Sequence, residues 1–242
     1  MNLARSLGSV GGLTLVSRIL GLARDMLFAQ FVGANFASDA FAVAWRMPNM
    51  FRALFAEGAF SAAFIPMFNR KVADPDGAGL SAGTDFAEDA LSVLLPALLL
   101  MTVLLEVLAW PATYLISLGF HDASPEQFAF AVMLARLTFP YLMLISLASL
   151  LGGILNSLHK FWVAAAAPIL LNVAQIVALV FFHTHEPLTT TKYQALSVTI
   201  GGALQLLWLM QACWANHVRL KIKRPTINAD VKRLMKLIVP AA

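Results

Sequence analysis

Four arginines lie inside the first two apolar stretches of this chain. The first stretch holds Arg18 and Arg24, and the second holds Arg46 and Arg52. A guanidinium at the centre of a bilayer costs about 2.5–3.5 kcal/mol on insertion scales, so it normally faces a partner or a polar cavity. Because the planar guanidinium fork matches phosphate oxygens, this surplus of cations predicts a cavity for an anionic, phosphate-bearing ligand.

Carboxylates in the same two stretches offer a structural alternative. Asp25 follows Arg18 by seven residues, which is about two helical turns. Arg46 follows Asp39 by the same spacing. With Glu57, these carboxylates would neutralise three of the four arginines as pairs between the two helices. One arginine remains in excess even then, and intramembrane charge clusters more often mark a substrate or ion path.

The composition indicates the class of protein. Hydrophobic residues make up 60% of the chain, charged residues make up 12%, and the mean hydropathy is +0.76, whereas soluble domains carry about 25% charged residues. We therefore expect an all-α integral membrane protein with six transmembrane helices and the start of a seventh. The expected spans cover residues 7–31, 36–68, 90–120, 128–158, 161–182 and 193–214.

The chain divides by composition into three parts. Residues 1–215 form the expected six-helix transmembrane lobe, and residues 216–236 form a basic linker with an amphipathic helix. Residues 237–242 begin a seventh span that stops about a third of the way across, so we expect the chain to be part of a longer protein. Asp74 to Asp89 contains one proline and three glycines and is expected to be an acidic linker between the second and third spans.

The loop cations predict the orientation. If the N-terminus is cytoplasmic, all loop cations except Lys192 lie in cytoplasmic segments, and Lys192 lies in a loop on the opposite side of the membrane. The positive-inside rule favours this orientation. We expect a multi-pass membrane protein whose N-terminus lies in the cytoplasm. The net charge of +4 then reflects topology, and nucleic acid is not an expected partner.

The chain shows no catalytic motif. It lacks a zinc-protease helix, a nucleophile elbow and a phosphate-binding glycine loop. Cys213 is its single cysteine, and no other residue at metal-ligand spacing accompanies it in the sequence. We expect a protein that is not an enzyme and has no cofactor or metal ion, and whose energy comes from a coupling ion, the membrane potential or a partner.

Several runs of residues resemble one known family. They are SRILGLARD at 17–25, DAF at 39–41, RMPN at 46–49 and FRALFAEGAFSAAFIP at 51–66. They are similar to the opening of the MurJ (MviN) lipid II flippases, of the multidrug/oligosaccharidyl-lipid/polysaccharide (MOP) exporter superfamily. The resemblance extends to the end of the chain and implies that the chain is the N-terminal lobe of two, with the C-terminal lobe of the same protein as its missing partner.

The resemblance also implies a function. The family inverts lipid II, an undecaprenyl-pyrophosphate-linked peptidoglycan precursor, across the inner membrane by alternating access through a cationic cavity, for cell-wall synthesis. Lipid II and membrane lipids are the implied partners. The resemblance makes three arginines essential cavity cations, sets one serine beside the substrate and assigns polar residues to the gate and cavity. These are Arg18, Arg24 and Arg52, then Ser17, then Asp25, Asp39, Asn49 and Glu57, to which the residue pattern adds Arg46.

Two alternatives from other classes stay open. A cation-coupled drug or polysaccharide exporter of the same superfamily would have a cavity dominated by acidic residues, whereas cations outnumber acids here by four to three in the first two spans. A non-transporting membrane scaffold would need only charge pairing, so it would tolerate the exchange of Arg18→Asp with Asp25→Arg.

Overall fold

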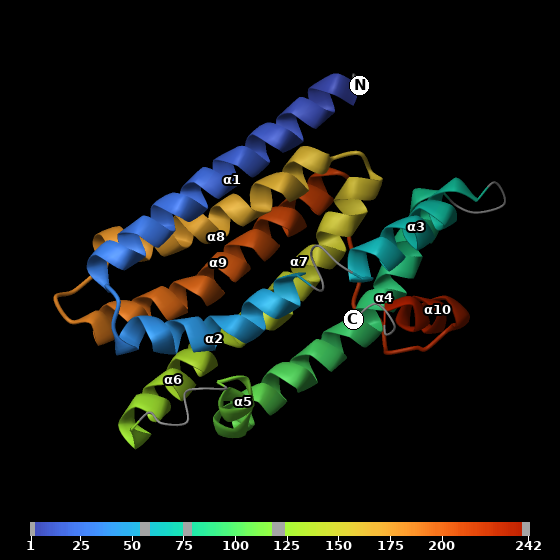
Figure 1. The fold of residues 1–242 in the computed structure, drawn as a ribbon. Coiled ribbons are helices and arrows are strands. Elements are labelled where there is room, and N and C mark those ends of the chain that lie inside the picture. Colours follow the sequence, from blue (N-terminus) through green and yellow to red (C-terminus); the bar gives the residue numbers. More distant parts are fainter. Residues whose placement is uncertain (1–2, 54–58, 75–78, 118–123, 239–242) are drawn as a thin grey trace.

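The computed structural model describes residues 3–53, 59–74, 79–117 and 124–238, and all regular secondary structure in these ranges is helical (Figure 1). The helices are α1 (Leu3–Phe31), α2 (Phe36–Arg52), α3 (Ala59–Ala73), α4 (Leu80–Val107), α5 (Ala109–Ile116), α6 (Pro125–Thr138), α7 (Pro140–Ser157), α8 (Phe161–Phe181), α9 (Pro187–Ala215) and α10 (Ala229–Ile238).

The long helices pack side by side in an order that differs from their order in the chain. Figure 1 shows α1 lying along α8, α8 along α9, and α9 along α7. Helix α2 packs on α6 and α7, while α3 packs between α4 and α7. The first and second expected spans are therefore not each other's main packing partners.

The class expected from composition is confirmed: the chain is an all-α integral membrane protein. Among the residues that the structure describes, four helical segments are long and apolar enough to cross a bilayer. They are α4 (Leu80–Val107), α6 with α7 (Pro125–Ser157), α8 (Phe161–Phe181) and α9 (Pro187–Ala215). They correspond to the third to sixth expected spans. The total of six spans stays a prediction.

Two expected spans are interrupted at short breaks. The span 128–158 breaks at Phe139, because Pro140 has no N–H to donate and its ring crowds the preceding turn. The span 90–120 breaks at Leu108, and Pro111 then lies in the first turn of α5, where a missing N–H costs little. The expected span 36–68 is divided between α2 and α3.

Helix α4 begins at Leu80, so the prediction of an acidic linker up to Asp89 is wrong for its second half. The carboxylates there are stabilised by partners distant in sequence. Glu88 is buried, accepts the backbone N–H of Lys221 at 2.9 Å and lies 2.9 Å from the ammonium of Lys223. Asp85 contacts the same ammonium at 3.1 Å. The segment 218–228 is thereby docked on the beginning of α4.

Two adjacent glycines of α9 allow close helix packing. A Cβ at Gly201 would lie 2.7 Å from Leu171 Cδ1 and 3.0 Å from the Leu171 Cα of α8. A Cβ at Gly202 would lie 2.6 Å from a ring carbon of Tyr141 on α7. Small residues at such contacts let helices approach within a membrane, so this pair sets how closely α7 and α8 approach α9.

We expect Gly201→Ala to lower the free energy of unfolding by about 1–3 kcal/mol, because the Leu171 backbone cannot move aside independently of α8. Thermal unfolding in detergent measures the effect. The matched control is Gly12→Ala in α1, where a Cβ meets no atom within 4 Å and alanine favours the helix. Equal melting temperatures for the two variants would contradict close packing at Gly201.

The contact of Lys223 with α4 also has a pH dependence. Hydrogen bonding to Glu88, with help from Asp85, raises the pKa of Lys223 above its usual range. A raised lysine pKa contributes stability that is fully present below the unfolded value of about 10.4 and is lost as pH rises through the folded value. The contact is therefore complete at neutral pH.

We expect Glu88→Ala to release the segment 218–228, because it removes the buried carboxylate that holds Lys221 and Lys223. A charged hydrogen bond contributes about 1.5–3 kcal/mol, so amide exchange in this segment should rise by about tenfold or more. Hydrogen exchange followed by mass spectrometry measures it. The control Asp85→Ala removes an exposed carboxylate and should have a much smaller effect.

Candidate functional site

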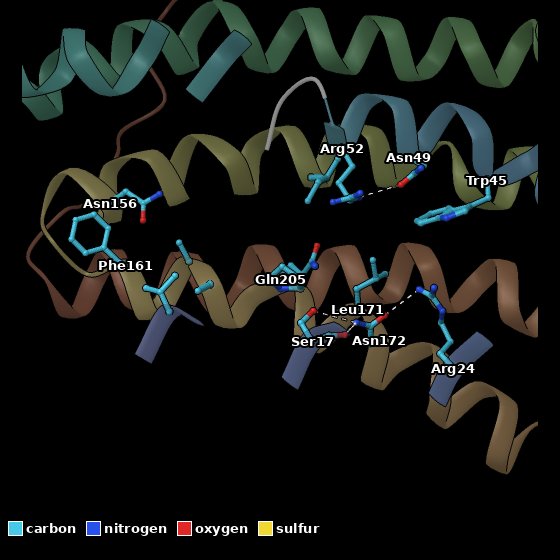
Figure 2. A pocket seen from close by; sticks show the side chains of 15 residues that line it. Ser17, Arg24, Trp45, Asn49, Arg52, Asn156, Phe161, Leu171, Asn172 and Gln205 are labelled. Atoms are coloured by element: carbon cyan, nitrogen blue, oxygen red, sulfur yellow. Dashed lines mark hydrogen bonds between the residues drawn. The ribbon is translucent and has the colours of Figure 1, made fainter. Parts of the chain in front are cut away.

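A cavity of about 560 Å³ lies between α1, α2, α7, α8 and α9 (Figure 2). Its wall combines apolar side chains with a few polar ones and two guanidiniums. The lining residues are Val10, Ser17, Arg24, Trp45, Asn49, Arg52, Ile145, Asn156, Phe161, Ala164, Ala165, Pro168, Leu171, Asn172 and Gln205. Pockets of this size and character are usual for small ligands and parts of larger ones.

Arg24 is held in the cavity wall by two partners. Its Nη2 lies 2.7 Å from Asp25 Oδ1, and its Nη1 donates to Asn172 Oδ1 of α8 at 3.1 Å. The Arg24 side chain is 21% exposed, whereas that of Asp25 is 67% exposed. The guanidinium is thus fixed in direction and retains a face toward the cavity, as Figure 2 shows.

Asn172 connects α1 to α8. Its amide accepts from Arg24 and donates from Nδ2 to the backbone oxygen of Ser17 at 2.9 Å, while the Ser17 hydroxyl lies 3.4 Å away. Only 7% of Asn172 is exposed. One amide therefore holds two residues of α1 in their positions at the cavity.

Arg52 reaches the cavity from α2. Its Nε donates to Asn49 Oδ1 at 3.2 Å. Trp45, Asn49 and Arg52 are spaced four and three residues apart, so they share one face of the helix, and Figure 2 shows this face turned to the cavity opposite Ser17 and Asn172. The two guanidiniums thus come from separate walls.

Three of the other predicted site residues lie elsewhere. Arg18 is exposed, does not line the cavity, and has no hydrogen bond or ion pair within the described ranges. Arg46 donates to the backbone oxygen of Ile116 at 2.8 Å. Asp39 is an exposed residue in the first turn of α2. Glu57 lies outside the described residues.

The pairing alternative receives no support from these contacts. Asp25 pairs with Arg24, its neighbour in the same helix, and no ion pair in the described part of the chain joins α1 to α2. The arrangement instead brings together four of the predicted residues, Ser17, Arg24, Asn49 and Arg52, around one cavity.

Sequence reasoning left two contributors undecided or unnoticed. The sequence does not determine where the Asn172 side chain points, because an asparagine in an apolar span can bond across helices or face a cavity. No motif identifies Gln205, although it is 2% exposed and lines the cavity. A polar amide inside an apolar run was the available signal for both.

The fold and the cavity define an all-α membrane protein with a cationic cavity between its helices. Residues 28–242 match the family described as Lipid II flippase MurJ, and the chain belongs to this family. It is therefore a bacterial membrane protein of a family of transporters rather than catalysts.

Individual relatives agree with this assignment. The chain is 42% identical to a probable lipid II flippase MurJ of Rhizobium tropici and 39% identical to the lipid II flippase MurJ of Burkholderia cenocepacia. Both alignments cover 100% of this chain, and they cover 45% and 46% of those two proteins. The chain thus spans a little less than half the length of these relatives.

Solved structures share the fold. A lipid II flippase MurJ in an inward closed conformation matches with a TM-score of 0.72 and 25% identity, over 96% of this chain and 46% of that chain. A MATE protein in complex with MaD3S matches with a TM-score of 0.68 and 14% identity, over 97% of this chain and 52% of that chain. The second similarity concerns the fold alone.

We expect Asn172→Leu to lower the free energy of unfolding by about 1–3 kcal/mol, because Arg24 and the Ser17 carbonyl lose their buried partner. Thermal unfolding and amide exchange of α1 measure the effect. Asn156→Leu is the matched control, since the Asn156 side chain lines the same cavity and forms no hydrogen bond to any residue described. Equal destabilisation by both substitutions would contradict this role of Asn172.

Proposed function

We propose that this chain is the N-terminal lobe of a flippase that moves lipid II from the cytoplasmic to the periplasmic leaflet of the bacterial inner membrane by alternating access, for cell-wall synthesis. The observation that carries the proposal is that Arg24 and Arg52 line one cavity against α8 and α9, two helices that are long and apolar enough to cross a bilayer. The relatives named as lipid II flippases support it.

The charge of the cavity suits a lipid-linked diphosphate. A diphosphate cannot cross hydrocarbon without cations and water, whereas a polyprenyl tail is stable in lipid. Guanidinium groups bind phosphate oxygens through paired, charge-assisted hydrogen bonds. We infer that the diphosphate lies between Arg24 and Arg52 and that the tail stays in the bilayer.

The remaining predicted residues receive proposed roles consistent with their positions. Asp25 holds Arg24 at the gate, and Asn49 orients Arg52. Ser17 lies beside the bound headgroup. Arg18 is proposed to meet the ligand or the second lobe in another state of the cycle, because its exposed position leaves it available. Asp39, Arg46 and Glu57 remain proposed polar residues of the gate.

The organisation of the chain belongs to the same proposal. Residues 1–215 form the lobe, residues 216–236 form a cytoplasmic linker, and residues 237–242 start a seventh span, with the N-terminus in the cytoplasm. The C-terminal lobe supplies the opposite wall of the pathway. A coupling ion or the membrane potential drives the cycle.

The charges in the cavity favour this function over the exporter alternative. A cation-coupled exporter requires carboxylates at its ion site, whereas the cavity wall formed by the described residues carries two arginines and no carboxylate. The similarity to the MATE protein concerns the fold and does not alter this balance.

Growth of bacteria depleted of their own lipid II flippase tests the proposal. The whole protein that carries this chain is expressed with Arg24→Ala or Arg52→Ala. Loss of one bidentate contact weakens diphosphate binding by about 10- to 100-fold, so we expect neither variant to restore growth. Lysine replacements should also fail, because lysine lacks the planar fork.

The control is Arg136→Ala, which removes an exposed arginine of α6 that does not line the cavity and should leave growth intact. Membrane levels of every variant are compared on immunoblots. Normal growth of both cavity variants at normal membrane levels would refute the proposed roles of Arg24 and Arg52.

A further inference from the structure

We propose that the cavity has an uncharged arm that binds the sugar part of the lipid headgroup, with Gln205 and Asn156 as its binding residues. The neutral arm is defined here by its polar residues Ser61, Ser149, Asn156 and Gln205. This inference rests on the proposed function, because it assumes that a diphosphate occupies Arg24 and Arg52.

The neutral arm opens from the larger cavity. It is a space of about 110 Å³ between α3, α7, α8 and α9. Asn156 and Gln205 line both spaces, as do three apolar residues, Ile145, Ala164 and Pro168. A ligand in the larger cavity can therefore extend into the arm past these two amides.

Gln205 carries a buried hydrogen-bonding group without a partner. Only 2% of the residue is exposed, and its Oε1 forms no hydrogen bond with the residues that the structure describes. Burying an unpaired polar group costs about 1–3 kcal/mol, so native proteins rarely leave one without a reason. The terminal torsion of glutamine is broad, so a small rotation turns either end of the amide toward a ligand.

Other polar groups of the arm are also available. The Asn156 side chain has no hydrogen-bond partner within the described residues. Ser149 donates its hydroxyl to the Ile145 backbone oxygen at 2.7 Å and keeps acceptor capacity on Oγ. Amides and hydroxyls both donate and accept, which matches the hydroxyl and acetamido groups of a sugar.

The uncharged lining of the neutral arm does not suit a second anionic group of the ligand. No ionised side chain lines the arm among the described residues, so a charged ligand group would lose its hydration without compensation. The arm accordingly suits a neutral and polar ligand group.

The order of residues along the cavity fits a headgroup with a diphosphate at one end. Figure 2 shows Arg24 at one end, Asn156 and Phe161 at the other, and Gln205 between them. A headgroup whose diphosphate lies between the guanidiniums thus passes Gln205 and reaches Asn156 with the sugar that follows. The Phe161 ring provides an apolar face beside it.

Binding of two ligands tests this inference. Undecaprenyl diphosphate and the same lipid with a disaccharide on its diphosphate are titrated onto the whole protein that carries this chain, in detergent, and complexes are counted by native mass spectrometry. We expect Gln205→Leu to weaken binding of the disaccharide form by about tenfold, the value of one hydrogen bond to a buried amide, and to leave the bare diphosphate unchanged. Asn156→Leu should act in the same direction.

The matched control is Gln194→Leu. Gln194 is a buried glutamine of the same helix that pairs with Gln175 at 3.0 Å and lines neither space. It should leave the ratio of the two affinities unchanged. An equal loss for both ligands in Gln205→Leu, or no loss, or the same change in Gln194→Leu, would overturn the inference.

Arg24→Ala separates this inference from the proposed function. It should weaken both ligands, because both carry the diphosphate. If it weakens neither, the proposed diphosphate site is wrong, whatever Gln205→Leu does. If it weakens both while Gln205→Leu is without selective effect, only the neutral arm is wrong.

Discussion

The need to compensate a guanidinium inside a membrane determines much of this structure. An arginine side chain is a cation with five N–H donors, and hydrocarbon offers these donors no acceptor. Asp25 and Asn172 satisfy part of the guanidinium and leave the rest toward the cavity. The same amide holds Ser17, so compensating one charge also fixes how α1 lies against α8. In the proposed function, a ligand phosphate binds the part of the guanidinium that the protein leaves unsatisfied.

The wall behind these side chains is rigid because the helices approach closely. Gly201 and Gly202 bring α9 into contact with Leu171 of α8 and Tyr141 of α7. Interior packing of this density transmits displacement and does not absorb it. Helix α8 carries Asn172 and α9 carries Gln205, so the closeness of these helices decides how precisely the two amides are placed. The packing of these helices therefore also positions the residues of the proposed binding site.

A second set of charges acts between the segment 218–228 and the beginning of α4. Lys223 is bound to Glu88, Asp85 and Asp89 of α4. The ion pairs join the segment before α10 to the beginning of α4, and Lys71 of α3 holds Asp230 at 2.8 Å. The segment 218–228 and α10 are thereby fixed against α3 and α4. Protein carboxylates compensate the Lys223 cation.

The sequence by itself determined the class, the helical content and the list of candidate cations. Long apolar runs have one stable solution in a bilayer, which is the helix, and the motif runs indicated the family. The tertiary structure decided which cations share a cavity, since Arg24 faces it and Arg18 does not. It also brought Asn172 within hydrogen-bonding distance of Arg24, 148 positions away in the chain. It further decided that α4 begins at Leu80 and includes the acidic residues that pair with Lys223. The physical reason is that lipid and protein interior are both apolar. Apolar periodicity in a membrane helix therefore does not tell which face packs on protein, and only the contacts between helices do.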